Sequence, residues 1–178
     1  EQQLRLIYNT VGDILYYLKV EPNDNYRFIS VNERFLSVTG LSKKQVVNKT
    51  IDEVIPEPSL SSLVRVNYLK AIRKKKIIYW EETSQYPGGS KTGIVSIAPI
   101  FDEMGKCTYL VGSVHDITER KKAEKQLHKL NRTYALLSDV NQTIMHVHEP
   151  MALFEAACHI AVEKGGFRMA WIGLLDSQ

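Results

Sequence analysis

The segment Val111-Gly-Ser-Val-His-Asp-Ile-Thr-Glu-Arg120 contains a junction between two structural patterns, because a strand pattern ends in it and a helix pattern begins. Residues 106–117 alternate as a strand does. From Thr118 onward, apolar residues recur at alternating steps of three and four, which is a helical period. The residues before and after this junction therefore belong to different structural units.

The residues before the junction have the signals of a mixed sheet-and-helix unit. Five strand-like segments span residues 14–20, 26–31, 77–86, 91–101 and 106–117. The segment 32–76 between the second and third strands contains several short helices and one longer helix that begins near Ser59. Two of the short helices begin with capping boxes, Ser42 with Gln45 and Thr50 with Glu53. The order predicts an α+β fold, a five-stranded antiparallel sheet with helices on one face, followed by a long C-terminal helix.

Composition excludes several classes of protein. The chain has 178 residues, 44% hydrophobic and 24% charged, with a net charge of +3. Its basic clusters lack interleaved aromatic residues, so we expect solvated helix faces and no nucleic-acid binding. No apolar run is long enough to cross a bilayer. Cys107 and Cys158 have no metal-binding or disulfide spacing, so free thiols and a cytoplasmic location are expected.

The helix after the junction has the 3.5-residue period of a coiled coil. We call its predicted contact positions the seam; they are Leu127, Leu130, Tyr134, Leu137, Asn141 and Ile144. A polar Asn141 in a seam fixes the register of a parallel pair. We therefore predict a homodimer through this helix, with packing onto the chain's own sheet-and-helix unit as the alternative.

Both ends of the chain carry additional elements. Apolar residues at helical spacing predict an N-terminal helix within residues 1–12. Pro150 suits the first turn of another helix, residues 151–164, and residues 167–175 have the pattern of a strand. The chain does not begin with Met and stops just after that apolar run, so we expect a fragment of a longer protein.

Four segments together resemble a PAS domain, a family of sensor modules. They are Phe28-Ile-Ser-Val-Asn-Glu-Arg-Phe35, Val38-Thr-Gly-Leu-Ser42, Tyr79-Trp-Glu81 and the opening stretch 111–120. The resemblance covers roughly residues 5–120 and places the sensor domain at 13–118, with a helical linker at 119–148. Residues 149–178, above all Gly165-Gly-Phe-Arg-Met-Ala-Trp-Ile-Gly173, resemble the truncated start of a GAF domain.

The PAS resemblance implies a small-molecule pocket between sheet and helices. Strand alternation and a match to ligand-binding relatives assign its lining to Phe35, Leu63, Val95, Ile97, Leu110, Gly112 and Val114. The alternative is that these residues fill a dry core. Glu81, Glu82 and Ser84 are candidate polar anchors, but the sequence leaves the register of their strand open.

The resemblance also implies a mechanical joint at Asp116 and Thr118, where the last strand passes into the output helix. A Thr at a helix N-cap accepts from a free backbone N–H of the first turn, and a carboxylate there is stabilised by the positive helix end. The alternative is that the two residues only cap the helix.

No cofactor is recognisable in the sequence. The helix at 59–76 lacks an axial His for haem, and the Asn-Cys-Arg-Phe segment of photoactive flavin relatives has no counterpart. His146 and His148 do not share a helix face, so we predict no metal. The segment from His128 to Thr133 only faintly resembles the phosphoacceptor box of histidine kinases.

We therefore predict a regulatory segment without catalytic residues. It would sense a small molecule or a partner and relay its state through the C-terminal helix to an output domain of the same chain, expected to be a histidine kinase. Two alternatives stay open, a ligand-free PAS module that dimerises and spaces other domains, and a phosphoacceptor fragment that uses His128.

Overall fold

The computed structural model describes residues 2–55, 57–147 and 149–173. The chain divides into two compact units, Glu1–Glu119 and Arg120–Gln178. We call them the sensor unit and the helical unit, and each is described by itself. Their division lies within two residues of the junction at Thr118 that the change of sequence period predicts.

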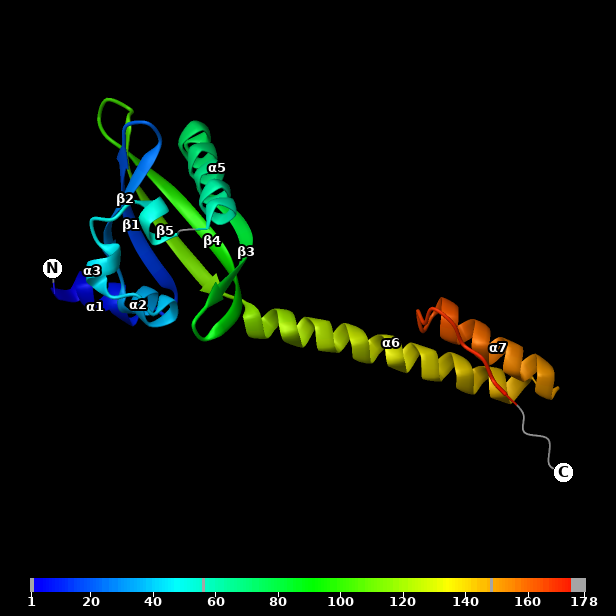
Figure 1. Cartoon of the computed structure of the whole chain (residues 1–178). Coiled ribbons are helices and arrows are strands. Elements are labelled where there is room, and N and C mark those ends of the chain that lie inside the picture. Colours follow the sequence, from blue (N-terminus) through cyan, green and yellow to red (C-terminus); the bar gives the residue numbers. More distant parts are fainter. Residues whose placement is uncertain (1, 56, 148, 174–178) are drawn as a thin grey trace. The chain divides into compact units, whose positions relative to one another are not determined.

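The sensor unit is built on one antiparallel sheet of five strands in the order β2-β1-β5-β4-β3. The strands are β1 (Ile14–Glu21), β2 (Asn25–Val31), β3 (Ile78–Tyr86), β4 (Gly89–Phe101) and β5 (Cys107–Asp116). The last strand lies in the middle of the sheet, between β1 and β4 (Figure 1). The end of β5 is therefore held from both sides at the point where the chain leaves the sheet.

Helices cover one face of this sheet (Figure 1). They are α2 (Glu33–Thr39), α3 (Lys43–Val46), α4 (Ile51–Val54) and α5 (Pro58–Lys74), with α1 (Gln2–Thr10) before the first strand. The two capping boxes form, since the Ser42 N–H donates to Gln45 at 2.9 Å and the Thr50 N–H to Glu53 at 2.7 Å. The predicted α+β fold is confirmed.

The core lies between the sheet and the helices that cover it. Its fully buried side chains include Leu18, Ile51, Ile97 and Leu110. Beside them, the rings of Tyr16, Phe28 and Phe35 pack at tilted or edge-on angles, with centroids about 6 Å apart. Strand residues that alternate toward the helices thus supply most of the core.

A single buried amide ties the start of the sheet to α1 and α2. The Asn32 side chain is fully buried, and its Oδ1 accepts from the backbone N–H groups of Leu15 and Phe35, each at 3.0 Å. Its Nδ2 donates to the carbonyl oxygens of Tyr8 at 3.2 Å and Asp13 at 2.9 Å. Four bonds saturate this side chain.

The helical unit consists of a helix pair and an irregular tail. Helices α6 (Thr118–His146) and α7 (Pro150–Glu163) lie side by side (Figure 1). Lys164 forms an ion pair with Asp139 at 2.6 Å, and Arg132 donates to the carbonyl of Gly165. Pro150 occupies the first helical position, as the sequence predicts.

The strand predicted at 167–175 is wrong over the residues that the structure describes. Residues 167–173 are irregular, and positions 174 and 175 lie outside the described residues. A strand needs a neighbour for its backbone hydrogen bonds, and no described segment of the helical unit supplies one. Residues 167–173 therefore have the apolar pattern of a strand but no neighbouring strand to pair with among the described residues.

Within the described ranges, no helix has both the length and the apolar character needed to span a membrane.

Candidate functional site

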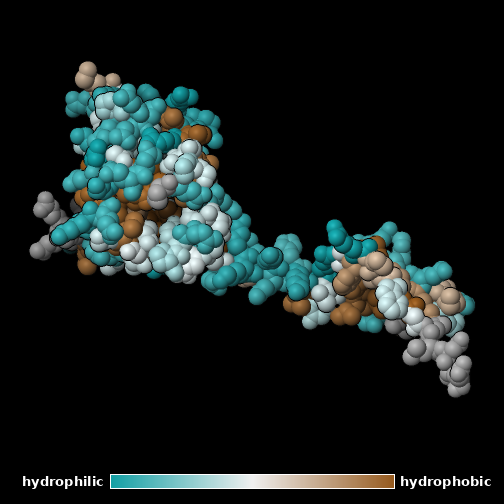
Figure 2. All heavy atoms as spheres, in the orientation of Figure 1, coloured by the Kyte–Doolittle hydropathy of each residue, from teal (hydrophilic) through white to brown (hydrophobic). Residues whose placement is uncertain are grey.

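A cavity of about 720 Å³ opens between the sheet and the helices of the sensor unit. It is lined by side chains from all five strands and from α2, α4 and α5. The residue of β5 that lines it, Val114, is in the C-terminal half of that strand. Hydrophobic residues are visible between hydrophilic ones on the surface of this unit (Figure 2). A volume of this size is within the range of small-molecule sites in proteins.

Four of the seven predicted pocket residues lie along this cavity. They are Phe35, Leu63, Val95 and Val114. Ile97 and Leu110 instead lie outside the lining, because both side chains are fully buried in the packed core. Gly112 lies opposite Tyr16 in the β1–β5 ladder, and the Tyr16 ring occupies the space above it.

Two tyrosines form a buried hydrogen-bonded pair in the cavity wall. The Tyr68 hydroxyl donates to the Tyr16 hydroxyl at 3.1 Å, and both side chains are buried. Burial raises the pKa of both phenols well above the usual range, so both stay protonated at neutral pH. Sequence reasoning missed this pair, because Tyr16 and Tyr68 are far apart in the chain.

The structure also determines the register of β3, which the sequence left open. Glu82 pairs with Gly93 and Ser84 with Lys91, and this alternation turns Glu82 and Ser84 into the cavity. Glu81 is exposed and is not part of the lining. The Glu82 carboxylate accepts hydrogen bonds from Trp80 Nε1 at 3.0 Å and from Ser84 Oγ at 2.9 Å.

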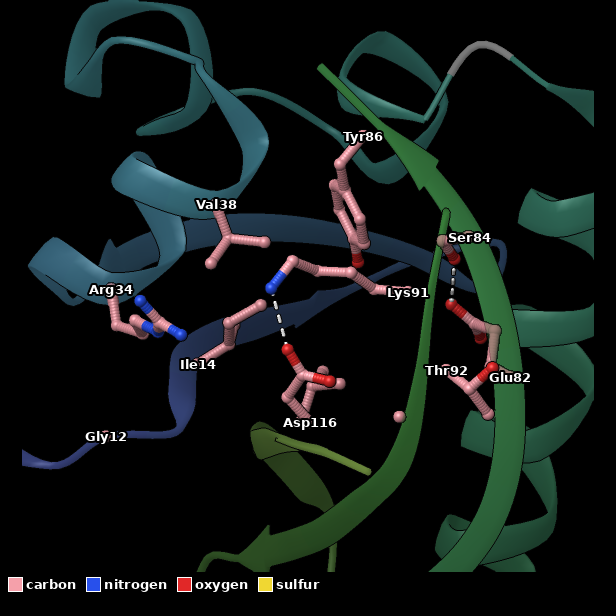
Figure 3. A pocket seen from close by; sticks show the side chains of 12 residues that line it. Gly12, Ile14, Arg34, Val38, Glu82, Ser84, Tyr86, Lys91, Thr92 and Asp116 are labelled. Atoms are coloured by element: carbon pink, nitrogen blue, oxygen red, sulfur yellow. Dashed lines mark hydrogen bonds and ion pairs between the residues drawn. The ribbon is translucent and has the colours of Figure 1, made fainter. Parts of the chain in front are cut away.

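A narrower pocket adjoins the cavity at the end of β5 (Figure 3). Ile14, Glu82 and Val114 line both spaces. Arg34, Lys91 and Asp116 line only the narrower one. The cavity and the narrower pocket therefore share part of their walls near the point where the chain leaves the sheet.

Asp116 is the centre of a polar cluster at the predicted joint. Its carboxylate binds Lys91 Nζ at 2.7 Å and accepts from the Thr118 backbone N–H at 3.0 Å and hydroxyl at 2.6 Å. The Lys91 ammonium, followed by the Thr118 hydroxyl, holds the pKa of Asp116 well below its usual range. The carboxylate is therefore ionised at neutral pH and bridges β4 to the start of α6.

Thr118 does not act as the N-cap that the sequence predicts. It is the first residue of α6, and its hydroxyl oxygen accepts from the Thr92 N–H of β4 at 2.9 Å. The Ile117 N–H donates to the Thr92 carbonyl at 2.9 Å, so two bonds join this junction to one residue of β4. The Asp116 side chain, not Thr118, accepts a backbone N–H at the start of the helix. Only the register of β4 against β5 brings Lys91 and Thr92 here, which is why sequence reasoning missed both.

The seam positions of α6 lie on the surface of the helical unit. Leu127, Leu130, Tyr134 and Leu137 are 50–63% exposed, and Asn141 is exposed too. The side chain of Ile144 lies outside the described residues. α7 covers a different face of α6, which contains the partly buried Leu136, Asp139 and Val140.

The histidines considered from the sequence are His128, His146 and His148. His128 and His146 are exposed on α6, and His148 lies outside the described residues. Across the part of the chain that the structure describes, no group of three His, Cys, Asp or Glu side chains is arranged to hold a metal ion.

Comparison with known proteins assigns the class of this chain. The model of the PAS fold family matches residues 8–122, which is more than half of the chain. The chain belongs to the PAS family.

Two curated relatives are sensors. A methyl sulfide methyltransferase-associated sensor of Methanosarcina acetivorans is 33% identical over 124 residues, covering 70% of this chain and 12% of the relative. The aerobic respiration control sensor protein ArcB of Escherichia coli is 28% identical over 136 residues, covering 74% of this chain and 17% of ArcB. The chain thus spans less than a fifth of either relative. The similarity to these two sensors supports a signal-sensing role for the PAS domain of this chain.

A solved structure shows the same fold. The PAS domain of BvgS from Bordetella pertussis superposes with a TM-score of 0.55 at 21% identity, over 74% of this chain and 96% of that domain. At this identity the likeness shows the fold alone.

Proposed function

We infer that the sensor unit is a signal-input module whose cavity binds a small molecule and whose β5–α6 junction relays occupancy to α6. One observation carries this inference. Val114 lines the cavity, and Asp116, two residues further along β5, holds the start of α6. Residues two apart on a strand share a face and are joined by a short piece of backbone, so we expect a ligand that displaces Val114 to shift Asp116 as well.

The relay follows from the bonds at the junction. Lys91, Asp116 and Thr118 join the end of β5 and the first turn of α6 to β4. A ligand that binds one arrangement of these strands more tightly shifts the population toward it. The element that this shift affects is the start of α6. We infer that α6 in turn controls an output domain of the longer protein, and that this output domain is a histidine kinase.

Replacing Asp116 by Asn should remove the response to the signal in the full-length parent protein while leaving its basal output in place. The amide keeps the side chain's size but loses the charge that binds Lys91, so β4 and α6 lose their strongest link. The measurement is output activity with and without stimulus. Glu103→Gln removes a carboxylate from the exposed β4–β5 turn and should respond as the unaltered protein does. An intact response in Asp116→Asn would contradict the relay.

A second candidate function, dimerisation through α6, is supported by the exposed seam. Four large apolar side chains at alternating spacings of three and four lie on one stripe of a long helix, which is how parallel coiled coils present their contact face. We infer a parallel pairing of two chains along this stripe. A module that only dimerises and spaces other domains would also use it.

Leu130→Glu should shift the chain from dimer to monomer, because it places like charges against each other at a contact position of the seam. Sedimentation equilibrium at micromolar concentrations measures the mass, and we expect the dissociation constant of the dimer to rise at least about tenfold. Ala135→Glu puts the same charge on an exposed position outside the seam and should stay dimeric. A monomeric unaltered chain at high concentration would rule out the pairing.

The remaining sequence predictions stay predictions. They include a cytoplasmic location, a GAF-like identity for residues 149–178, and the regulatory, non-enzymatic character of the segment. The phosphoacceptor alternative for His128, which is exposed on α6, also stays a prediction.

A further inference from the structure

The charged groups of the cavity all have one sign. Among the described residues that line it, Glu57 and Glu82 are carboxylates, and Lys, Arg and His are absent. The adjoining narrower pocket, which Glu82 also lines, contains two basic side chains, Arg34 and Lys91, and Lys91 is already paired with Asp116. The charged residues of the cavity's own lining are therefore all negative, and they favour a ligand with a positive charge.

Glu82 has free capacity to bind a ligand. An ionised carboxylate offers about four acceptor sites. The bonds from Trp80 and Ser84 use two of them and fix the orientation of the group, one donor on each oxygen (the Ser84 bond is drawn in Figure 3). The carboxylate is half-buried on the cavity wall, so an incoming donor would meet it with little water between them.

The rest of the wall is rich in aromatic rings. Tyr16, Phe28 and Phe35 form one cluster, and Tyr68 packs edge-on against Trp80 with centroids 6.4 Å apart. All five line the cavity. Ring faces attract cations as well as apolar groups, and an aromatic wall next to a carboxylate is the usual way proteins recognise an ammonium group.

We propose that the cavity selects an organic ammonium ion with an apolar body, whose charged end binds Glu82 and whose body lies against the aromatic cluster. This rests on the proposed ligand-binding function and names its ligand class. A carboxylate of the same shape would have to lose its water next to Glu82 without a cation to replace it. A neutral analogue would lose the charge-assisted bond but keep the apolar contacts.

Three probes of one shape and different charge test this proposal at pH 7. They are 4-phenylbutylamine, 4-phenylbutanol and 4-phenylbutanoate, titrated into the whole chain by calorimetry. We expect the amine to bind at least about tenfold more tightly than the alcohol, and the acid most weakly. Glu82→Gln keeps the side chain's size and should abolish the preference for the amine over the alcohol. Glu81→Gln changes the neighbouring carboxylate on the other face of β3 and should keep it.

The outcomes separate the ligand class from the proposed function. Equal binding of the three probes, or tighter binding of the acid, would overturn the ammonium proposal and leave a ligand-binding cavity. A preference for the amine that survives Glu82→Gln would overturn the role of Glu82 and with it the proposed site. If none of the probes binds, both the ligand class and the ligand-binding part of the proposed function fail.

Discussion

Asn32→Ala is expected to destabilise the sensor unit by about 3 kcal/mol, which corresponds to a fall of roughly 10 °C in melting temperature. The substitution leaves the N–H groups of Leu15 and Phe35 and the carbonyls of Tyr8 and Asp13 without their partner. Buried backbone groups that lose a hydrogen bond cost more than the bond itself contributes. The same change removes the N-cap of α2.

Hydrogen exchange of amides in β1 and β5 measures this effect, because it reports unfolding of the sensor unit separately from the helical unit. Asn9→Ala is the matched control. The Asn9 side chain accepts a single, longer bond of 3.3 Å from the Glu33 N–H on the surface, so its loss should cost no more than about 0.5 kcal/mol. Equal protection in the Asn32→Ala and Asn9→Ala variants would show that water replaces the amide without cost.

Asn32 also shows where sequence reasoning stops. Its role as the cap of a short helix is local, since the Phe35 N–H lies three residues away and the pattern of a cap followed by apolar residues predicts it. Its bonds to Tyr8, Asp13 and Leu15 depend on how α1 enters the sheet. The amino-acid sequence alone does not show how α1 is placed against the first strand.

The candidate site likewise combines features that local sequence signals predict with features that depend on contacts between distant residues. Turn residues and capping boxes are local signals, so the order of strands and helices could be predicted. Which strand residues line the cavity depends on pairing across the sheet. Val114 lines it whereas Gly112, on the same face of the same strand, is covered by a tyrosine from β1. Strand alternation gives the face, but the size of the residue opposite decides whether a position is open.

The failed strand at 167–173 makes a related point. A strand pattern predicts structure only where another strand is available to pair with it. In the sensor unit, hairpin turns between β1 and β2 and between β3 and β4 bring partners together within a few residues. The tail of the helical unit follows a helix and has no such neighbour among the described residues.

Gly112→Ala is the second substitution with a large expected effect, a loss of about 3 kcal/mol in the free energy of unfolding. A Cβ at this position would lie 2.0 Å from Cζ of the Tyr16 ring. The ring has little room to move, because it packs against Phe28 and Phe35 and its hydroxyl is bonded to Tyr68. Gly12→Ala is the control, since no atom lies within 4 Å of an added Cβ there.

A double-mutant cycle with Tyr16→Leu identifies the cause of that loss. If the clash with the ring is responsible, Gly112→Ala should cost less than about 1 kcal/mol once the ring is gone, which makes the two changes strongly non-additive. Urea denaturation followed at the sensor-unit amides gives the four free energies. An equal cost in both backgrounds would mean that β5 tolerates no Cβ at residue 112 for reasons of its own backbone. Because Tyr16 forms part of the cavity wall, the coupling also measures how firmly β1 and β5 hold that wall in place, and a wall that yields easily would transmit little of a ligand's binding to Asp116.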